Sequence, residues 1–391
     1  MNVETTSADF RRAIFLAGKV VERRSTIPIL SMIRCHANGS FEATGTDLDM
    51  TLTATVARVP GANADFCMQS PQQVITAVAA AGGKGVTMKH DGSKLQASSD
   101  ALEITVDTLP ADDFPIDHLR PLDEQFSATF SPADIAAIER VTGAVSTEET
   151  RYYLNGVRLK SVRPTTIQAQ ATDGHRLYLC DIELPDAKGE LGESIIIPRK
   201  AVRLLIELAK SAKDGVRLVI GSPAPANRPE GTAPERPGAT RLRLSFAERS
   251  ADISLTSKLI DGTFPAVEKV IPAGGDKQAL FAVSAIRRAL AAVSGHSREI
   301  RAIKVVFDAP GSATLSAAYL GIGLAASIKV PCEHNAPGFT VGYNGGYLAS
   351  IVNAARGDEV LFTMTDETAP TLVKNPADTA WTGVLMPMRV S

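Results

Sequence analysis

Two blocks decide the fold of this chain: RYYLNG at residues 151–156 and ATDGHRL at residues 171–177. The second block lies within residues 167–184, where apolar and polar side chains alternate as they do in strands. Thr172-Asp173-Gly174 falls near the middle of that run, and these residue types favour a turn. Residues 167–184 therefore predict an antiparallel hairpin with a turn at its tip.

The hairpin pattern recurs at residues 41–56 and 314–330, and helical patterns flank each copy. The six helices that we predict have apolar residues at helical spacing and span residues 7–23, 71–81, 132–146, 198–212, 284–295 and 345–356. The first two copies also end alike, because Leu109 and Leu259 each stand five residues before a Phe-Pro pair. A pattern used three times predicts one supersecondary unit in three copies.

We therefore expect an α+β protein with three domains, at residues 1–124, 125–276 and 277–391. The second domain is the longest, and residues 221–240 account for most of the difference. That segment holds five prolines and three glycines and has almost no apolar periodicity, which is typical of a solvated loop.

Composition excludes several protein classes. With 391 residues, 44% of them hydrophobic, the chain can form several cores, so it is not a disordered protein. It has no apolar run of about 18 residues and no basic N-terminus followed by an apolar core, so we expect a cytoplasmic protein. The four cysteines, which lack C-x-x-C spacing and so predict reduced packing residues, are Cys35, Cys67, Cys180 and Cys332.

The charge is small in total but unevenly distributed. A net charge of −2 argues against a uniformly basic nucleic-acid binder. The six predicted helices nevertheless hold 12 Lys and Arg against 5 Asp and Glu, so they carry +7 while the rest of the chain carries −9. This segregation favours a cationic surface that attracts phosphates without reading bases; the alternative is that the cations simply occupy solvated helix faces.

Four separated blocks, residues 151–156, 171–177, 257–265 and 386–390, closely resemble the bacterial DNA polymerase III β subunit, the replicative sliding clamp. The resemblance implies three repeated DNA-clamp domains, with helices lining the inside and antiparallel sheets outside, which close into a ring as a homodimer. It implies a non-catalytic protein without cofactor or metal that encircles duplex DNA and confers processivity. The implied partners are the DNA polymerase III α subunit, an ATP-driven clamp loader and other proteins that carry clamp-binding peptides.

The resemblance also implies two sites. The residues expected to contact DNA are Arg24, Tyr152, Tyr153, Arg199 and Lys200. Arginine and lysine neutralise phosphates, and tyrosine contacts sugars or stacks on exposed bases. The residues expected to form a groove for partner peptides are Leu154, Thr172, Gly174, His175, Arg176, Leu177, Pro265, Val270, Tyr347, Met386, Pro387, Met388 and Arg389. Apolar side chains and flexible methionines suit a groove that accepts several peptide sequences.

The chain departs from the family pattern at three places. Its tail ends in Val390-Ser391, Lys269 stands where arginine is common, and Ser294-Gly295-His296 replaces apolar residues that usually face the neighbouring subunit. These changes, with the 221–240 loop, raise two hypotheses: a weaker dimer and a specialised second clamp. Full stimulation of the host's replicative polymerase would count against the second hypothesis.

A hydrolase that uses Asp173 and His175 is the alternative from another functional class. The two residues could form an acid–base pair, but no nucleophile motif accompanies them, and Thr-Asp-Gly predicts a turn equally well. The sequence also lacks a phosphate-binding G-x-x-x-x-G-K-[ST] loop, a dinucleotide fingerprint and an H-E-x-x-H motif.

Overall fold

The structure, a computed structural model, describes residues 2–22, 25–116, 119–224, 238–248, 250–294, 302–319 and 324–390. Arg24, Gly295-His296 and most of the predicted loop at 221–240 lie outside these residues. The described chain forms two compact units. The first comprises residues 1–135, 186–192 and 203–259, and the second comprises residues 136–185, 193–202 and 260–391.

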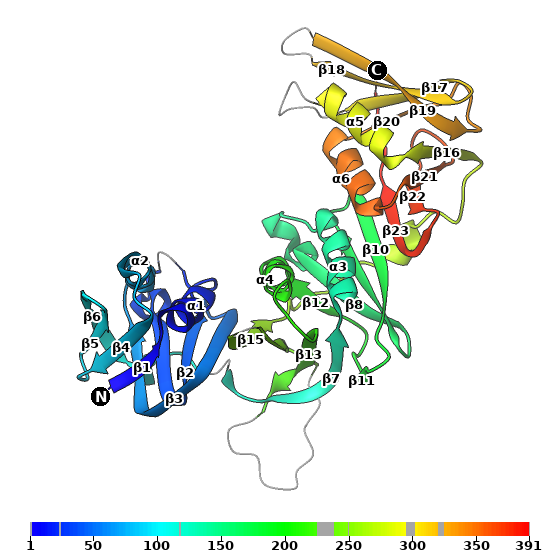
Figure 1. The fold of residues 1–391 in the computed structure, drawn as a ribbon. Coiled ribbons are helices and arrows are strands. Elements are labelled where there is room, and N and C mark those ends of the chain that lie inside the picture. Colours follow the sequence, from blue (N-terminus) through cyan, green and yellow to red (C-terminus); the bar gives the residue numbers. More distant parts are fainter. Residues whose placement is uncertain are drawn as a thin grey trace. The chain divides into compact units, whose positions relative to one another are not determined.

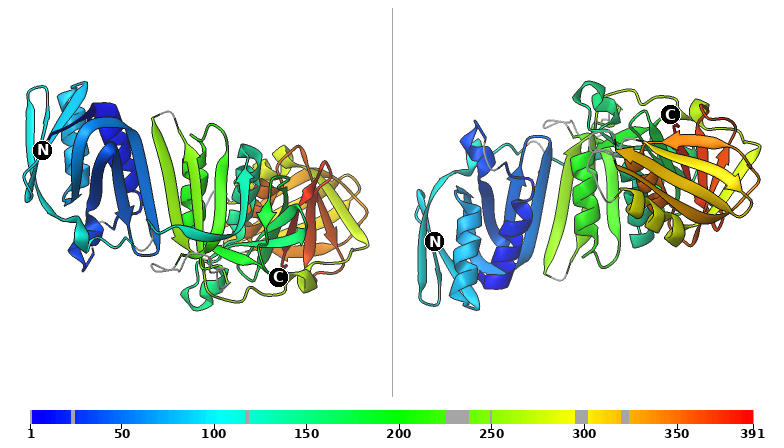
Figure 2. Two further views of the ribbon diagram at one scale, coloured as in Figure 1. Left: turned by 90° about the horizontal axis from the view of Figure 1, so that it is seen from below. Right: turned by 90° about the horizontal axis from the view of Figure 1, so that it is seen from above.

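The first unit is built on an antiparallel sheet whose strands come from the first repeat and part of the second (Figure 1). Its strands are β1 Asn2–Thr6, β2 Ile33–Thr46, β3 Met50–Met68, β4 Gly85–His90, β5 Lys94–Ser99, β6 Leu102–Pro110, β7 Leu122–Phe130, β11 Lys188–Gly189, β13 Val216–Pro223, β14 Arg241–Ala247 and β15 Ala251–Lys258. They run in the order β1-β4-β5-β6-β3-β15-β14-β13-β7-β11, and β2 pairs with β3. Two helices, α1 (Ser7–Ala17) and α2 (Pro71–Ala81), pack side by side, and α1 lies against β2 and β3 (Figure 2).

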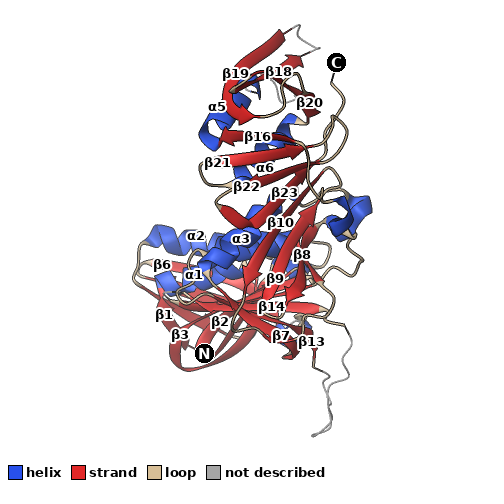
Figure 3. Ribbon diagram, turned by 90° about the vertical axis from the view of Figure 1, so that its right-hand side faces the viewer, coloured by secondary structure: helices blue, strands red, loops and turns tan. Residues whose placement is uncertain are grey.

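The second unit repeats this design with the remaining strands. These are β8 Gly156–Arg163, β9 Thr166–Thr172, β10 Arg176–Glu183, β12 Ile195–Pro198, β16 Lys277–Ala282, β17 Ile303–Ala309, β18 Ser312–Tyr319, β19 Leu324–His334, β20 Thr340–Tyr343, β21 Glu359–Met364, β22 Thr371–Asn375 and β23 Asp378–Leu385. Their order is β12-β8-β9-β10-β23-β22-β21-β16-β19-β18-β17-β20. Helices α5 (Val283–Ser294) and α6 (Gly345–Ala355) pack together on this sheet (Figure 3).

The six predicted helices are confirmed among the described residues, with α3 at Pro132–Val141 and α4 at Arg199–Ala209. Several of them end earlier than predicted. The first ends at Ala17, because the next amides bond three residues back, Lys19 to Leu16 and Val20 to Ala17. Val20 is buried all the same, so the apolar spacing that extended the prediction reports burial beyond the helix end. The three predicted hairpins are also confirmed, as β2–β3, β9–β10 and β18–β19.

Backbone pairing joins neighbouring repeats. In the first unit, β3 pairs with β15 from Met50↔Ser257 to Val56↔Ala251. In the second unit, β10 pairs with β23 from Arg176↔Leu385 to Cys180↔Trp381. Each sheet therefore runs without interruption from one repeat into the next.

Arg140 fastens α3 to the third repeat within the second unit. Its Nε donates to the carbonyl of Ala354 (2.9 Å) and its Nη2 to that of Ala355 (3.0 Å), both at the C-terminal end of α6. The guanidinium also pairs with Asp378 and lies 5.3 Å from the ring centre of Trp381. Only 8% of the Arg140 side chain is exposed, so its guanidinium is shielded from solvent.

All four cysteines are buried and unpaired, as the spacing predicted. Burial raises the pKa of every one of these thiols, to about 12 for Cys67 and about 11 for Cys180 and Cys332. Since the thiolate is the reactive form, the four thiols are chemically quiet packing groups.

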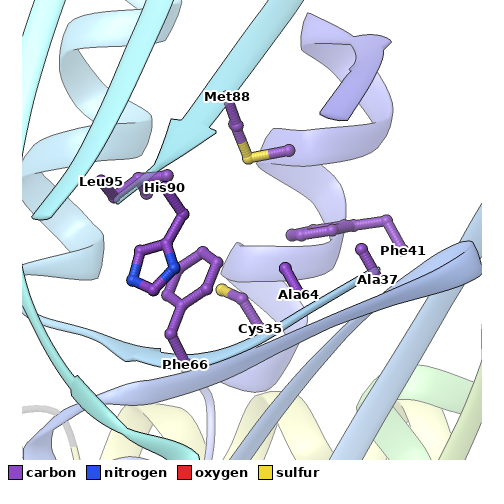
Figure 4. Close-up of a pocket in the computed structure, with 8 residues that line it drawn as sticks. All are labelled: Cys35, Ala37, Phe41, Ala64, Phe66, Met88, His90 and Leu95. Carbon is purple, nitrogen blue, oxygen red and sulfur yellow. The ribbon is translucent and has the colours of Figure 1, made fainter. Parts of the chain in front are cut away.

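A small apolar cavity lies in the core of the first repeat (Figure 4). Cys35, Phe66, Met88 and His90 are among its lining residues. The rings of Phe66 and His90 are stacked, with centroids 4.3 Å apart, and His90 Nε2 lies 3.0 Å from the hydroxyl of Thr108. His90 is thus held as a packing residue of the cavity wall.

Lowering the pH is expected to destabilise the first unit through His90. Burial lowers the pKa of this imidazole from its ordinary value of about 6.5, so the unfolded chain binds the proton more readily than the folded chain. Stability therefore falls as the pH drops below about 6.5. Urea unfolding at pH 7 and pH 5 should show a smaller loss in His90→Gln than in the unchanged protein, and an equal loss in both would contradict this assignment.

Candidate partner-peptide groove and DNA-facing residues

A Thr-Asp turn connects β9 to β10 and frames the groove. Thr172 Oγ1 donates to the carbonyl of Arg176 (2.7 Å) and accepts from the amide of Gly174 (3.1 Å). Asp173 Oδ1 accepts from the amides of His175 and Arg176, both at 3.0 Å. Gly174 has a φ of +88°, a conformation that glycine adopts without strain. Thr172 and Asp173 are therefore needed for the shape of the turn.

The turn also orients the side chains that it carries. Asp173 Oδ2 pairs with Arg176 Nε (2.9 Å), and the Arg176 guanidinium lies 4.5 Å from the ring centre of Tyr347. The same tyrosine stacks on His175, with centroids 5.6 Å apart. Asn344 caps α6 and accepts the amide of Tyr347 (3.2 Å), which fixes the tyrosine on the first turn of that helix.

Because of these contacts, the Asp173 carboxylate and the His175 ring are not arranged as an acid–base pair. Both oxygens of Asp173 accept hydrogen bonds from the turn and from Arg176, while the His175 ring packs on an aromatic face. Their positions are explained by the structure of the groove wall.

The groove has a volume of about 310 Å³ and is mainly apolar. Nine of the thirteen predicted groove residues line it: Leu154, Thr172, Gly174, His175, Arg176, Leu177, Pro265, Val270 and Met386. Beneath it lies a buried cluster of Leu154, Leu177, Leu179, Ile196, Phe264, Val267, Leu372 and Val384. Val270 is 52% exposed, so the groove presents apolar surface to solvent.

The prediction missed five lining residues: Arg151, Tyr153, Ala266, Val267 and Val384. Each is within four residues of a predicted groove residue in the sequence. Val267 and Val384 also belong to the buried cluster, so their apolar character alone could not separate a groove wall from a core.

The C-terminal tail crosses one side of the groove and is held by its backbone. The amide of Met386 donates to the carbonyl of His175 (2.9 Å), and the amide of Met388 donates to the carbonyl of Gly342 (2.8 Å). A Cβ at Gly342 would lie 2.3 Å from Cγ1 of Val390, so glycine is required for this close approach. The tail continues past the lining residue Met386 with Pro387, Met388 and Arg389. Tyr347 does not line the groove itself but stacks on His175, which does.

The described residues predicted to contact DNA form two adjacent pairs: the rings of Tyr152 and Tyr153 are 5.8 Å apart, and the amide of Arg199, next to Lys200, donates to the carbonyl of Asn155 (3.0 Å). Arg199 and Lys200 are both exposed at the start of α4, where the helix dipole disfavours positive charge. Helix stability therefore does not explain two cations at this position. Tyr152 is 54% exposed, whereas Tyr153 lines the groove.

The three domains of one family match the chain in order. The N-terminal domain of the DNA polymerase III beta subunit matches residues 1–119, the central domain matches residues 134–266 and the C-terminal domain matches residues 268–389. The chain belongs to the DNA polymerase III beta subunit family. The beta sliding clamp of Caulobacter vibrioides is 31% identical over 401 residues, with all of both chains covered. That of Escherichia coli K12 is 26% identical and covers 94% of each chain.

Solved beta sliding clamps have the same fold. A clamp from Caulobacter crescentus superposes with a TM-score of 0.86 at 28% identity, covering 100% of this chain and 99% of its own. A clamp from Pseudomonas aeruginosa gives 0.85 at 25% identity, with both chains fully covered. Three clamp domains of antiparallel sheets and helices are confirmed, and closure into a homodimeric ring is typical of the family.

As a beta sliding clamp the chain is a non-catalytic processivity factor of DNA replication. The hydrolase alternative is not supported, which agrees with the packing of Asp173 and His175. Among the described helices, none has the length and apolar character needed to cross a membrane.

Proposed function

We propose that the groove beside the Thr-Asp turn is where this sliding clamp binds peptides of its partners. The observation that carries the proposal is an exposed apolar hollow, bordered by the Thr-Asp turn and by the C-terminal tail that is hydrogen-bonded to it. Apolar side chains of a short segment can be buried there, while backbone groups at the rim fix its direction. The DNA polymerase III α subunit and the clamp loader are the partners that we assign to this site.

Duplex DNA is proposed to pass through the ring near Arg24, Arg199 and Lys200, with Tyr152 and Tyr153 close by. The exposed cations at the start of α4 support this assignment, because their charge is unfavourable for the helix itself. Contacts of this kind neutralise phosphates and carry no base specificity. We further propose domain limits at residues 1–124, 125–276 and 277–391, and a cytoplasmic location, where bacterial chromosomes are replicated.

If the protein encircles duplex DNA as a closed ring, it is kept on the DNA by this linkage and not by tight binding. After an ATP-driven loader places the clamp on nicked circular DNA, the clamp should dissociate slowly. After the circle is linearised, it should dissociate rapidly. Gel filtration of labelled clamp with DNA before and after restriction cleavage measures both rates. Equal loss from circular and linear DNA would overturn the proposal.

Replacing both Arg199 and Lys200 with glutamine is expected to weaken non-specific DNA binding. If each contacts one phosphate, the slope of log K against log salt concentration should fall by about 2. Fluorescence anisotropy with a labelled duplex across a salt series measures the slope. Glutamine at Lys374, an exposed cation on strand β22 and not on a helix, serves as the control and should leave the slope unchanged. An unchanged slope in the double variant would remove Arg199 and Lys200 from the DNA surface.

A further inference from the structure

The Thr-Asp turn that frames the groove is present a second time, in the first repeat. Thr46 Oγ1 donates to the carbonyl of Met50 (2.8 Å) and accepts from the amide of Leu48 (3.1 Å). Asp47 Oδ1 accepts from the amides of Asp49 (3.1 Å) and Met50 (2.7 Å). Leu48 has a φ of +70°, so it occupies the left-handed position that glycine fills in the groove turn. The two turns thus share one hydrogen-bonding pattern.

The strands around the two turns are equivalent as well. In both places the first residue of the strand after the turn pairs with a residue at the end of the last strand of the next repeat. The backbone amide one position further along the chain donates a hydrogen bond to a carbonyl of the turn. The equivalent contacts are Met50↔Ser257 with Lys258 N to Asp49 O (2.8 Å), and Arg176↔Leu385 with Met386 N to His175 O (2.9 Å). The first unit therefore contains the backbone frame that borders the groove in the second unit.

The side chains on the two frames differ in kind. Strand register matches four apolar residues of the buried cluster beneath the groove with four polar residues of the first unit: Leu177, Leu179, Leu372 and Val384 correspond to Thr51, Thr53, Arg243 and Thr256 respectively. All four polar residues line a hollow of about 380 Å³. The same frame thus presents hydroxyl groups and a guanidinium where the groove presents leucine and valine.

Arg243 carries a half-buried positive charge in this hollow, and its hydrogen-bond partners are neutral. Its Nε donates to Thr256 Oγ1 (3.2 Å) and its Nη2 to the carbonyl of Arg120 (2.6 Å), but no carboxylate pairs with it among the described residues. Burial lowers the pKa of Arg243, and the nearby Arg241 lowers it further. A half-buried cation without an anion is costly, and a bound carboxylate would relieve that cost.

The end of the hollow away from Arg243 carries a neutralised arginine and a carboxylate. Arg34 is neutralised there by Asp65, with Nε and Oδ1 2.7 Å apart, while Glu42 lines the same end and forms no hydrogen bond among the described residues. Between the two ends lie the hydroxyls of Thr53 and Ser254. A ligand that suits the whole hollow has an acidic group at one end and hydrogen-bond donors at the other.

We propose that this hollow is a second docking site, which takes an extended polypeptide segment with a glutamate or aspartate side chain on Arg243. Thr51 already donates to Thr46 (3.0 Å) and Thr53 is bonded to Thr44 (3.0 Å), but each hydroxyl oxygen can accept a further hydrogen bond. A peptide backbone supplies alternating donors and acceptors for these oxygens and for the hydroxyl of Ser254. A single free oxyanion would reach Arg243 but would leave Glu42 and the remaining hydroxyls unused. The proposal goes beyond the groove's role and does not depend on it, because the residues that carry it lie in the first unit.

Selection from two peptide pools tests the proposal. Both pools hold random nine-residue peptides, one with a central glutamate and the other with a central glutamine, and both are passed over the immobilised full chain. The expected result is that glutamate-centred peptides are retained by the unchanged protein and at least 10-fold less by Arg243→Gln. Arg217→Gln is the matched control, because this arginine lies on the neighbouring strand β13 and is already paired with Glu124 (3.4 Å). It should retain the peptides fully.

Two further variants separate this site from the groove and from misfolding. Peptides bound at the hollow should still bind Val270→Asp, which alters only the groove, and should bind Thr53→Val less well although its charge is unchanged. Loss of the same peptides in Val270→Asp, or equal retention of both pools, would overturn the proposal. Binding of inorganic phosphate that Arg243→Gln abolishes, with no peptide enriched from either pool, would also overturn it, because that result would indicate a free oxyanion site only.

Discussion

Replacing Arg140 with alanine is expected to lower the free energy of unfolding of the second unit by about 3–5 kcal/mol. The change removes two hydrogen bonds to the last carbonyls of α6 and an ion pair with Asp378. It also leaves space over Trp381, which is fully buried. The chain has a single tryptophan, so its fluorescence during urea unfolding reports on this region directly.

The adjacent residue provides the control for this measurement. Glu139 pairs with Arg356 at 3.2 Å, and about half of each side chain is exposed. Because solvent screens such pairs, Glu139→Ala should change the same transition by less than about 1 kcal/mol. If Arg140→Ala shifts the transition no more than Glu139→Ala does, Arg140 does not fasten α3 to the third repeat.

Replacing Val270 with aspartate is expected to weaken binding of apolar partner peptides by about 30- to 100-fold. The variant loses the burial of one valine side chain, about 1.5 kcal/mol, and adds a carboxylate that must be desolvated when the peptide binds. Val270 is exposed in the free protein, so folding should be unaffected. Anisotropy of a labelled peptide from the clamp-binding segment of the polymerase α subunit measures the affinity.

Val162→Asp is the matched control for the groove variant. Val162 is also an exposed valine of the second unit, at 40% exposure, but it does not line the groove. It should bind the peptide as the unchanged protein does. Equal affinity of Val270→Asp and Val162→Asp would show that the peptide binds elsewhere.

The sequence predicted elements whose signals are local. Helices follow from apolar spacing, and prolines stand at the first position of two of them, Pro71 in α2 and Pro132 in α3. The Thr-Asp turn could be predicted because its hydrogen bonds join residues two to four positions apart. Pairing between repeats could not be predicted in this way, because the partners of Met50 and Arg176 lie about 200 residues away, at Ser257 and Leu385.

The groove was predictable mainly through the family resemblance. Periodicity alone would place Leu177 and Val384 in a core, and they do contribute to one beneath the groove. Tyr153 was predicted to contact DNA, which stays a prediction, and it also lines the groove. The second, polar frame was not predicted, because Thr51, Thr53 and Thr256 resemble the outer face of any strand until their register is known.

The strand pairing between repeats has a mechanical consequence. Seven residue pairs connect β3 to β15 and five connect β10 to β23. A load directed along the strands is shared among all the backbone hydrogen bonds of such a ladder, so under shear neither seam opens one bond at a time. When a ring of two such chains is forced open, we expect both seams to stay paired, so that each of the two units moves as one body with its internal seam intact.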